Sequence, residues 1–262
     1  MKPLLFSILV ILSFSTVEIF AESFPEDVWE KAIKITKSPI NDTIVYDGKW
    51  TYEYEWKPTS WDYVSDGYHT LNIRTAHYEQ FIYVLLDYDV DDNLKHENDH
   101  AIFCIDSDNN KTLGVTGDEF CFELLMNSST PSTYMLEIND KMITKKQIDN
   151  HSDLIGVSSL SDENDRYSKI PHPSYEFKIP IDLFGRSNNY GVFISVYDSQ
   201  NNKTMNWPDN LETSQNIPSP KIWGYMISPD NSLPEFPFPL LIIAIILPIT
   251  IILTRSGRFS IK

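Results

Sequence analysis

Two apolar runs at opposite ends of the chain constrain it most. Residues 3–14 follow Lys2, and residues 238–253 precede a basic tail. The first run is typical of a secretory signal peptide, and the second is typical of a membrane-spanning helix. We therefore expect the polar, acidic residues between them to lie outside the cell, with a single-pass anchor in the cell membrane.

The N-terminal run has the features of a cleaved signal. Lys2 supplies the positive charge, and Ala21 is a small residue at the expected cut, so the mature chain would start near Glu22. An uncleaved N-terminal anchor is the alternative. The run is short for a membrane span, which favours cleavage.

The C-terminal run is just long enough to cross a bilayer. Residues 236–253 would span about 27 Å as a helix, against a hydrocarbon core of roughly 30 Å. Arg255, Arg258 and Lys262 favour a cytoplasmic tail. A helix buried in a protein core is the alternative interpretation.

A short motif stands just before this run, at Pro234, Glu235 and Phe236. The motif, the apolar helix and the basic tail together resemble the archaeal sorting signals that archaeosortases read. That resemblance implies cleavage near the motif and transfer to a lipid anchor. Pro237 stands where such signals usually continue with glycine, so a plain membrane-spanning anchor stays open.

Charge and cysteines restrict the function classes. The formal net charge of −16 repels nucleic acids and anionic surfaces. The two cysteines, Cys104 and Cys121, each lie between apolar residues that indicate strand interiors. Outside the cell a disulfide between them is the default, and two reduced, buried thiols are the alternative.

The region between the apolar ends predicts an all-β fold. A short helix is expected near Pro25, with Val28, Ala32 and Ile35 on one face. The segments of β-branched and aromatic residues that we expect to form strands are 71–74, 81–86, 100–106, 119–125, 133–138, 175–179, 191–197 and 222–227. Residues 141–173 are polar and weakly periodic, and we expect a long excursion there.

These patterns define the expected organisation of the chain. The predicted segments are a signal peptide (1–21), an N-terminal helical segment (22–40), a β-sandwich (41–228), a stalk with the sorting motif (229–237), a transmembrane helix (238–254) and a basic cytoplasmic tail (255–262).

The order of short motifs in the sandwich region resembles the family 9 carbohydrate-binding modules and related DOMON-like sandwiches. The motifs are Asp47-Gly48-Lys49-Trp50 followed by Trp56, a strand ending at Asp87 and Asp89, Asp106-Ser107-Asp108, Gly117-Asp118, a strand from Tyr175 to Pro180, a glycine-led strand ending at Asp198, Trp207-Pro208 and Trp223-Gly224. The resemblance spans roughly 40–228 and implies an antiparallel β-sandwich that binds carbohydrate.

One acidic loop is a candidate calcium site. Asp106, Asp108 and Asn110 alternate along the loop, and Asp118 faces them from the next expected strand. Calcium takes several oxygen ligands, and it is known in the modules that the chain resembles. A solvated acidic loop is the alternative. A second acidic group, Asp87, Asp89, Asp91 and Asp92, is interpreted as a solvated turn, with a metal site as the alternative.

Aromatic rings are the candidate ligand contacts. In the resembled family, tryptophans stack on sugar rings, and Trp207 and Trp223 lie in the matching C-terminal region. Trp61 lies in another segment rich in tryptophan and tyrosine and is the next candidate. Trp50 and Trp56 are expected in the core.

Three functions remain in competition. Carbohydrate binding is the first, and a structural role at the cell surface is the second. Haem binding, known in related DOMON domains, is the third and is disfavoured, because the candidate ligands Met126, Met135, Met142, Met226, His69, His77 and His100 show no pairing. The sequence has no catalytic motif such as Gly-X-Ser-X-Gly, and we expect no enzymatic activity.

Overall fold

The structure is a computed structural model that describes residues 24–40, 43–90, 98–139, 142–209, 217–230 and 233. The predicted signal peptide, transmembrane helix, cytoplasmic tail and sorting motif (Pro234, Glu235 and Phe236) lie outside the described residues, as do Asp91 and Asp92. Within the described ranges, no helix is long and apolar enough to cross a membrane.

The described part of the chain forms two units, one ending at Lys31 and one beginning at Ala32. The first contains helix α2 (Glu26–Lys31), which starts directly after Pro25 and carries acidic residues in its first turn and Lys31 in its last. These charges complement the helix dipole. The prediction that Ala32 and Ile35 lie on one face of this helix was wrong, because both residues follow the helix and are buried in the second unit.

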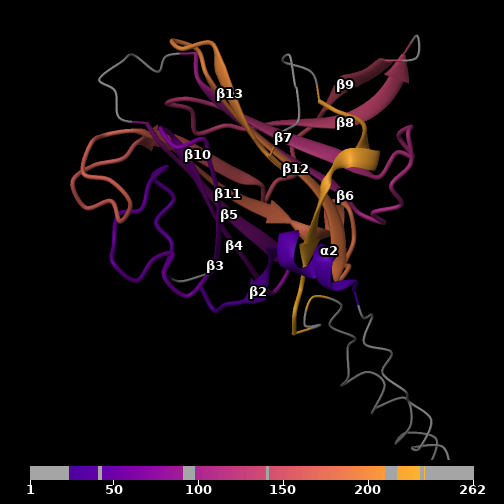
Figure 1. Ribbon diagram of the computed structural model, residues 1–262, viewed down its shortest axis with the longest axis horizontal. Coiled ribbons are helices and arrows are strands. Elements are labelled where there is room, and N and C mark those ends of the chain that lie inside the picture. The colour runs from indigo at the N-terminus through magenta and orange to yellow at the C-terminus, as the bar shows by residue number, and fades with distance from the viewer. Residues whose placement is uncertain are drawn as a thin grey trace, which may run out of the picture. The chain divides into compact units, whose positions relative to one another are not determined.

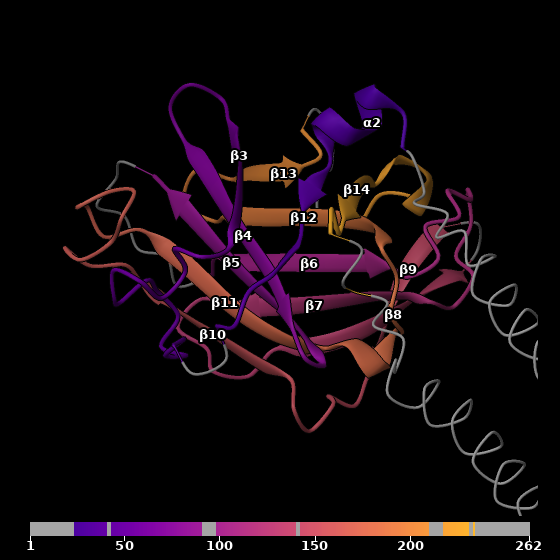
Figure 2. The same cartoon turned by 90° about the horizontal axis from the view of Figure 1, so that it is seen from below.

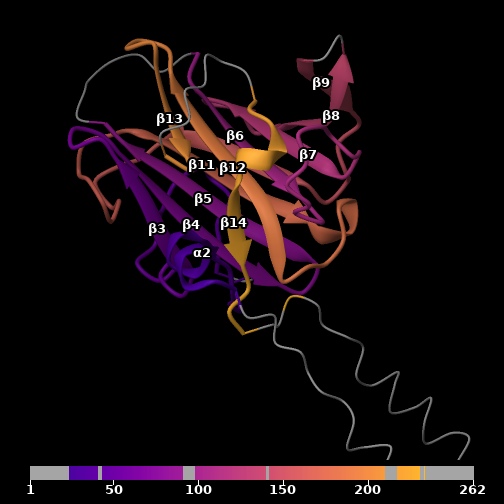
Figure 3. The same cartoon turned by 45° about the vertical axis from the view of Figure 1, so that its right-hand side comes forward.

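The second unit is a β-sandwich of two sheets, seen as two layers in Figures 1 and 3. The eight-stranded sheet follows the order β1 (Ile33–Lys34), β14 (Gly224–Ile227), β12 (Asn189–Asp198), β6 (His100–Asp106), β7 (Glu119–Leu125), β8 (Ser132–Asn139) and β9 (Met142–Ile148), and β13 (Lys203–Trp207) pairs with β12. The six-stranded sheet follows the order β10 (Ile155–Leu160), β11 (Pro173–Pro180), β5 (Phe81–Asp89), β4 (Thr70–Tyr78) and β2 (Thr36–Lys37), and β3 (Ser60–Ser65) pairs with β4.

Nearly all strand pairs are antiparallel, as predicted. The exceptions are two short consecutive strands. Strand β1 pairs in parallel with β14 of the eight-stranded sheet, and β2 pairs in parallel with β4 of the six-stranded sheet. The segment 33–37 therefore passes from one layer to the other. Figure 2 shows the strands of the two layers crossing at an angle.

Apolar side chains fill the space between the sheets, and smaller clusters lie on their outer faces. Leu71, Ile73, Val84, Leu86 and Phe177 belong to the main core. Trp50, Trp56, Tyr83 and Leu85 form a second cluster with residues near the start of the sandwich. The predicted core positions of Trp50 and Trp56 are confirmed.

The predicted excursion at 141–173 was wrong, because it contains β9 and β10. Strand β9 lies at the edge of its sheet and leaves both faces largely exposed, with Lys145 and Lys146 on it. An edge strand of this kind needs no apolar alternation, so its sequence carries little strand signal. Residues 161–172 form a loop over the six-stranded sheet, and this loop positions the site described next.

Candidate functional site

Trp207 and Trp223 do not form an exposed binding surface. Trp207 is 6% exposed and Trp223 is 2% exposed. The prediction that these two rings stack on a ligand is therefore wrong. A buried indole face has no room for a sugar ring.

Both rings are buried by specific neighbours. The Trp207 ring lies so close to the Cα of Gly224 that a methyl group there would lie 2.3 Å from a ring carbon. Trp223 stacks on Phe193 with ring centroids 6.2 Å apart, and its indole nitrogen donates to the carbonyl of Pro218. These tryptophans therefore pack the sandwich rather than form a binding surface.

Trp61 is the exposed tryptophan of the predicted set, at 53%. Its ring lies nearly parallel to that of Tyr63, with centroids 5.5 Å apart, and to that of Tyr167, at 6.3 Å. Trp61 and Tyr63 lie on one face of β3 because they are two residues apart. Tyr167 reaches the same place from the 161–172 loop. These three rings and Arg74 are called the Trp61 surface below.

Arg74 holds the aromatic rings of this surface together. Its guanidinium lies 5.7 Å from the Trp61 ring centroid and 5.8 Å from that of Tyr167, and its Nε donates to the Tyr167 hydroxyl at 2.6 Å. Arg74 is opposite Trp61 in the β3–β4 register, so both side chains leave the sheet on the same face. Asn72, also on β4, accepts a hydrogen bond from the Trp61 indole at 3.1 Å and fixes the ring.

A pocket of about 390 Å³ lies beside this surface. It is lined by Trp50, Thr51, Tyr52, Glu53, Asn164, Asp165, Arg166 and Lys169. Trp50 joins the pocket to the surface, because it packs edge-on against Tyr167 at 5.9 Å and its ring lies 5.2 Å from the Arg74 guanidinium. Polar and aromatic groups thus converge at one end of the six-stranded sheet.

The three acidic residues among the predicted calcium ligands lie close together. Asp106, Asp108 and Asp118 each place a carboxylate oxygen within 4.8 Å of the others. Burial, with Asp108 and Asp118 close by, raises the pKa of Asp106 to about 7. Asn110 lies beside this group, because its main-chain nitrogen donates to Asp108 Oδ1 at 3.1 Å, and its own Oδ1 accepts from the main-chain nitrogen of Thr112.

Cys104 and Cys121 form the predicted disulfide. They are directly paired in the β6–β7 register, with Cα atoms 4.0 Å apart. The bridge lies in an apolar cluster that also holds Phe193 and Trp223.

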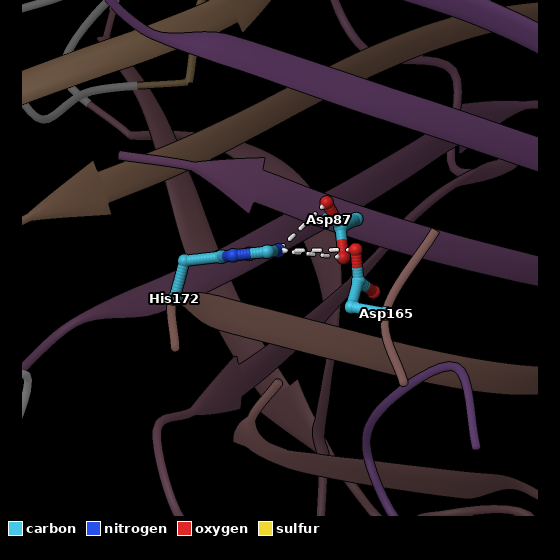
Figure 4. Close-up of side chains that lie close together, drawn as sticks. All are labelled: Asp87, Asp165 and His172. Carbon is cyan, nitrogen blue, oxygen red and sulfur yellow. Dashed lines mark hydrogen bonds and ion pairs between the residues drawn. The ribbon is translucent and has the colours of Figure 1, made fainter. Parts of the chain in front are cut away.

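A further polar cluster, shown in Figure 4, joins Asp87, Asp165 and His172. All three side chains are fully buried. His172 Nε2 is 3.0 Å from both carboxylate oxygens of Asp87 and 3.9 Å from Oδ1 of Asp165. Burial lowers the pKa of His172, but the hydrogen bond and charge of Asp87 outweigh burial and raise it to about 9. Burial and the charge of Asp87 raise the pKa of Asp165 to about 6.

Sequence reasoning missed this cluster by interpreting Asp87 as part of a solvated turn. One signal was present, since Asp87 interrupts the apolar run Phe81–Val90, and a charged residue inside a buried strand requires a partner. The partner itself had no local signal, because His172 lies 85 residues away.

Comparisons with known proteins find similar structures but no similar sequence. No protein-family model matches the sequence, and no curated protein matches it. Two solved structures of a family 9 carbohydrate-binding module from Caldicellulosiruptor kristjanssonii are similar in structure. The one in complex with cellotriose has a TM-score of 0.49 and 13% identity, and the match covers 77% of this chain and 96% of that chain. The one in complex with glucose has a TM-score of 0.48 and 13% identity, with 76% and 95% covered. A similarity of this size assigns no ligand to this chain.

Proposed function

We propose that this protein binds carbohydrate at the Trp61 surface. The observation that carries the proposal is the exposed, nearly parallel pair Trp61 and Tyr63, continued by Tyr167 and backed by the guanidinium of Arg74. Flat aromatic faces suit the apolar C–H patches of sugar rings, and amide and guanidinium groups beside them suit hydroxyl groups. Trp61, Tyr63 and the further tyrosines Tyr52 and Tyr54 are all exposed.

The adjoining pocket extends this surface with polar groups. Asn164, Arg166 and Lys169 line it together with Trp50. Sites for small ligands typically combine aromatic walls with a few polar groups that fix orientation.

A glycan array probed with the full chain tests the proposal. Trp61→Ala should weaken binding about two- to tenfold, since aromatic stacking contributes roughly 0.5–1.5 kcal/mol beyond area burial. Trp29→Ala, which removes a partly exposed indole from helix α2, is the matched control and should leave binding unchanged. A folded protein that binds no glycan would contradict the proposal, and so would equal loss in both variants.

We also propose that the 106–118 loop binds calcium through Asp106, Asp108 and Asp118. The support is their spacing and the fully buried Oδ2 of Asp106, which has no hydrogen-bond partner. A hard divalent cation would satisfy this oxygen and relieve the repulsion among three carboxylates.

The cell-surface location remains part of the proposal, and its support is the pair of apolar runs in the sequence. A disulfide is typical of the same side of the membrane. Deleting residues 238–254 should move the protein from the membrane fraction to the soluble fraction, whereas a protein that stays in the membrane fraction would contradict this anchor.

A further inference from the structure

The cluster of Asp87, Asp165 and His172 buries two carboxylates beside a single histidine, and this arrangement points to a bound ligand. The three side chains come from the end of β5, the 161–172 loop and the residue before β11, and they meet with ligand atoms within 4.8 Å (Figure 4). Each is fully buried. A buried carboxylate is costly unless a cation compensates its charge.

The hydrogen-bond partners of His172 indicate which of its ring nitrogens carries a hydrogen. Nδ1 lies 3.0 Å from the hydroxyl oxygen of Ser161, which can donate or accept, and 2.7 Å from the carbonyl oxygen of Ile170, which can only accept. The shorter contact to an obligate acceptor requires a hydrogen on Nδ1. Nε2 then faces two carboxylate oxygens of Asp87 at 3.0 Å. A lone pair directed at a carboxylate is repulsive, so a cation lies between them, either a proton or a metal ion.

Charge balance distinguishes these two cations. A proton on Nε2 compensates one carboxylate and leaves the second without a countercharge. Among the ion pairs of the described residues, His172 is the only partner of Asp87 and of Asp165. Lys169 is near, but its ammonium donates to the main-chain carbonyl of Asp165 rather than to the carboxylate. A divalent ion would neutralise both carboxylates.

Two further oxygens at the cluster have no partner. Asp165 Oδ1 accepts from the main-chain nitrogens of Tyr167 and Ser168, whereas its Oδ2 is buried without a hydrogen bond. The hydroxyl of Ser174 is also buried without one, and Ser174 is directly opposite Asp87 in the β11–β5 register. Buried oxygens of this kind are normally satisfied, and a coordinated ion with its water would satisfy them.

We propose that Asp87, Asp165 and His172 bind a divalent transition-metal ion. One imidazole nitrogen with carboxylate oxygens suits zinc or manganese, whereas calcium takes oxygen ligands alone. The hydrogen bond from Nδ1 to the Ile170 carbonyl is the usual support of a metal-binding histidine. Asp165 is also among the residues that line the neighbouring pocket.

The expected role of the ion is to hold the 161–172 loop on the six-stranded sheet. Two ligands, Asp165 and His172, belong to the loop and its end, and Asp87 belongs to the sheet. The loop carries Tyr167, so the ion would also position one ring of the Trp61 surface. The metal site does not depend on carbohydrate binding.

Metal analysis of the full chain tests the proposal. The protein, purified without a polyhistidine tag, is stripped with a chelator and then dialysed separately against zinc, manganese and calcium. About one equivalent of zinc or manganese should remain bound, and the melting midpoint should rise. Asp165→Asn should weaken zinc binding more than about tenfold. Asp162→Asn, in the same loop but paired with Lys49 at the surface, is the matched control and should retain the metal.

Two outcomes would overturn the proposal. The first is a metal-binding result: either the folded protein retains neither zinc nor manganese, or the Asp165→Asn variant retains as much zinc as the original protein. The second comes from ¹⁵N spectra of histidine-labelled protein in the presence of zinc. If both ring nitrogens of His172 carry protons, the cluster is an imidazolium–carboxylate pair, and this test needs no variant to fold.

Discussion

The carboxylate of Glu176 accepts a hydrogen bond of 2.9 Å from the indole nitrogen of Trp56. Its other oxygen accepts from the main-chain nitrogens of Asp47 and Gly48, at 3.1 and 2.7 Å. One buried side chain on β11 thus holds the segment 47–56 against the outer face of the six-stranded sheet. Asp47, Gly48 and Trp56 therefore act together, because all three donate to the same buried side chain.

Trp56→Phe should lower the free energy of unfolding by about 2 kcal/mol, because a hydrogen bond to a buried carboxyl group is lost along with ring volume. Urea denaturation measures the change. Trp29→Phe, the same substitution at a partly exposed position, should stay within about 0.5 kcal/mol. Equal effects at both positions would show that the Glu176 contact contributes nothing.

Gly48→Ala should be more damaging than Gly67→Ala. Both glycines have positive φ, at +85° and +91°, so both variants carry the same backbone strain. A Cβ at Gly48 would lie 2.5 Å from the backbone of Ser158, whereas a Cβ at Gly67 meets nothing within 4 Å. Since overpacking costs about 1–3 kcal/mol, the two variants should differ by that amount in urea denaturation. Indistinguishable stabilities would contradict the close approach of this segment to β10.

Reducing the disulfide, or replacing both cysteines with alanine, should cost about 3 kcal/mol of stability, as the loop-entropy model gives for this separation. The unreduced protein should show no free thiol on titration. Free thiols in the folded, unreduced protein would exclude the bridge.

Strands with a strong local apolar pattern were predictable from the sequence, whereas contacts between distant segments were not. Strands β6 and β7 were predicted to the residue, because β6 is an apolar run between His100 and Asp106 and β7 is a largely apolar run that begins at Glu119. Trp207 was misplaced because its burial depends on Gly224, a partner that no local pattern reveals. The Trp61 surface was predicted only through one residue, since Arg74 and Tyr167 join Trp61 through the sheet register and a distant loop.

Calcium should raise the melting midpoint, and Asp108→Asn should reduce this shift. A ligand bound only by the folded state stabilises it by about 2.7 kcal/mol at a hundredfold excess over its dissociation constant. Asp153→Asn, which removes an exposed carboxylate from a different loop, is the matched control. A midpoint that is the same in calcium and in chelator would count against the site.

The protein should be more stable at pH 5 than at pH 8. Burial raises the pKa of Glu55 and of Glu176 above the usual carboxyl range, which is near 4.5. A raised pKa in the folded state contributes stability that is fully present below the unfolded pKa and is lost as the pH rises through the folded value. The net charge of −16 at neutral pH acts in the same direction, because self-repulsion of a compact acidic protein falls as carboxylates take up protons.

Urea denaturation across this pH range, compared between variants, separates the two causes. Glu176→Gln removes a titrating group from the buried site and should flatten the pH dependence, even though losing an acceptor also lowers stability at every pH. Glu53→Gln, an exposed neighbour in the same segment, changes the net charge equally and should leave the slope nearly unchanged. If both variants flatten the slope alike, net charge alone sets the pH dependence and the buried carboxyl groups do not.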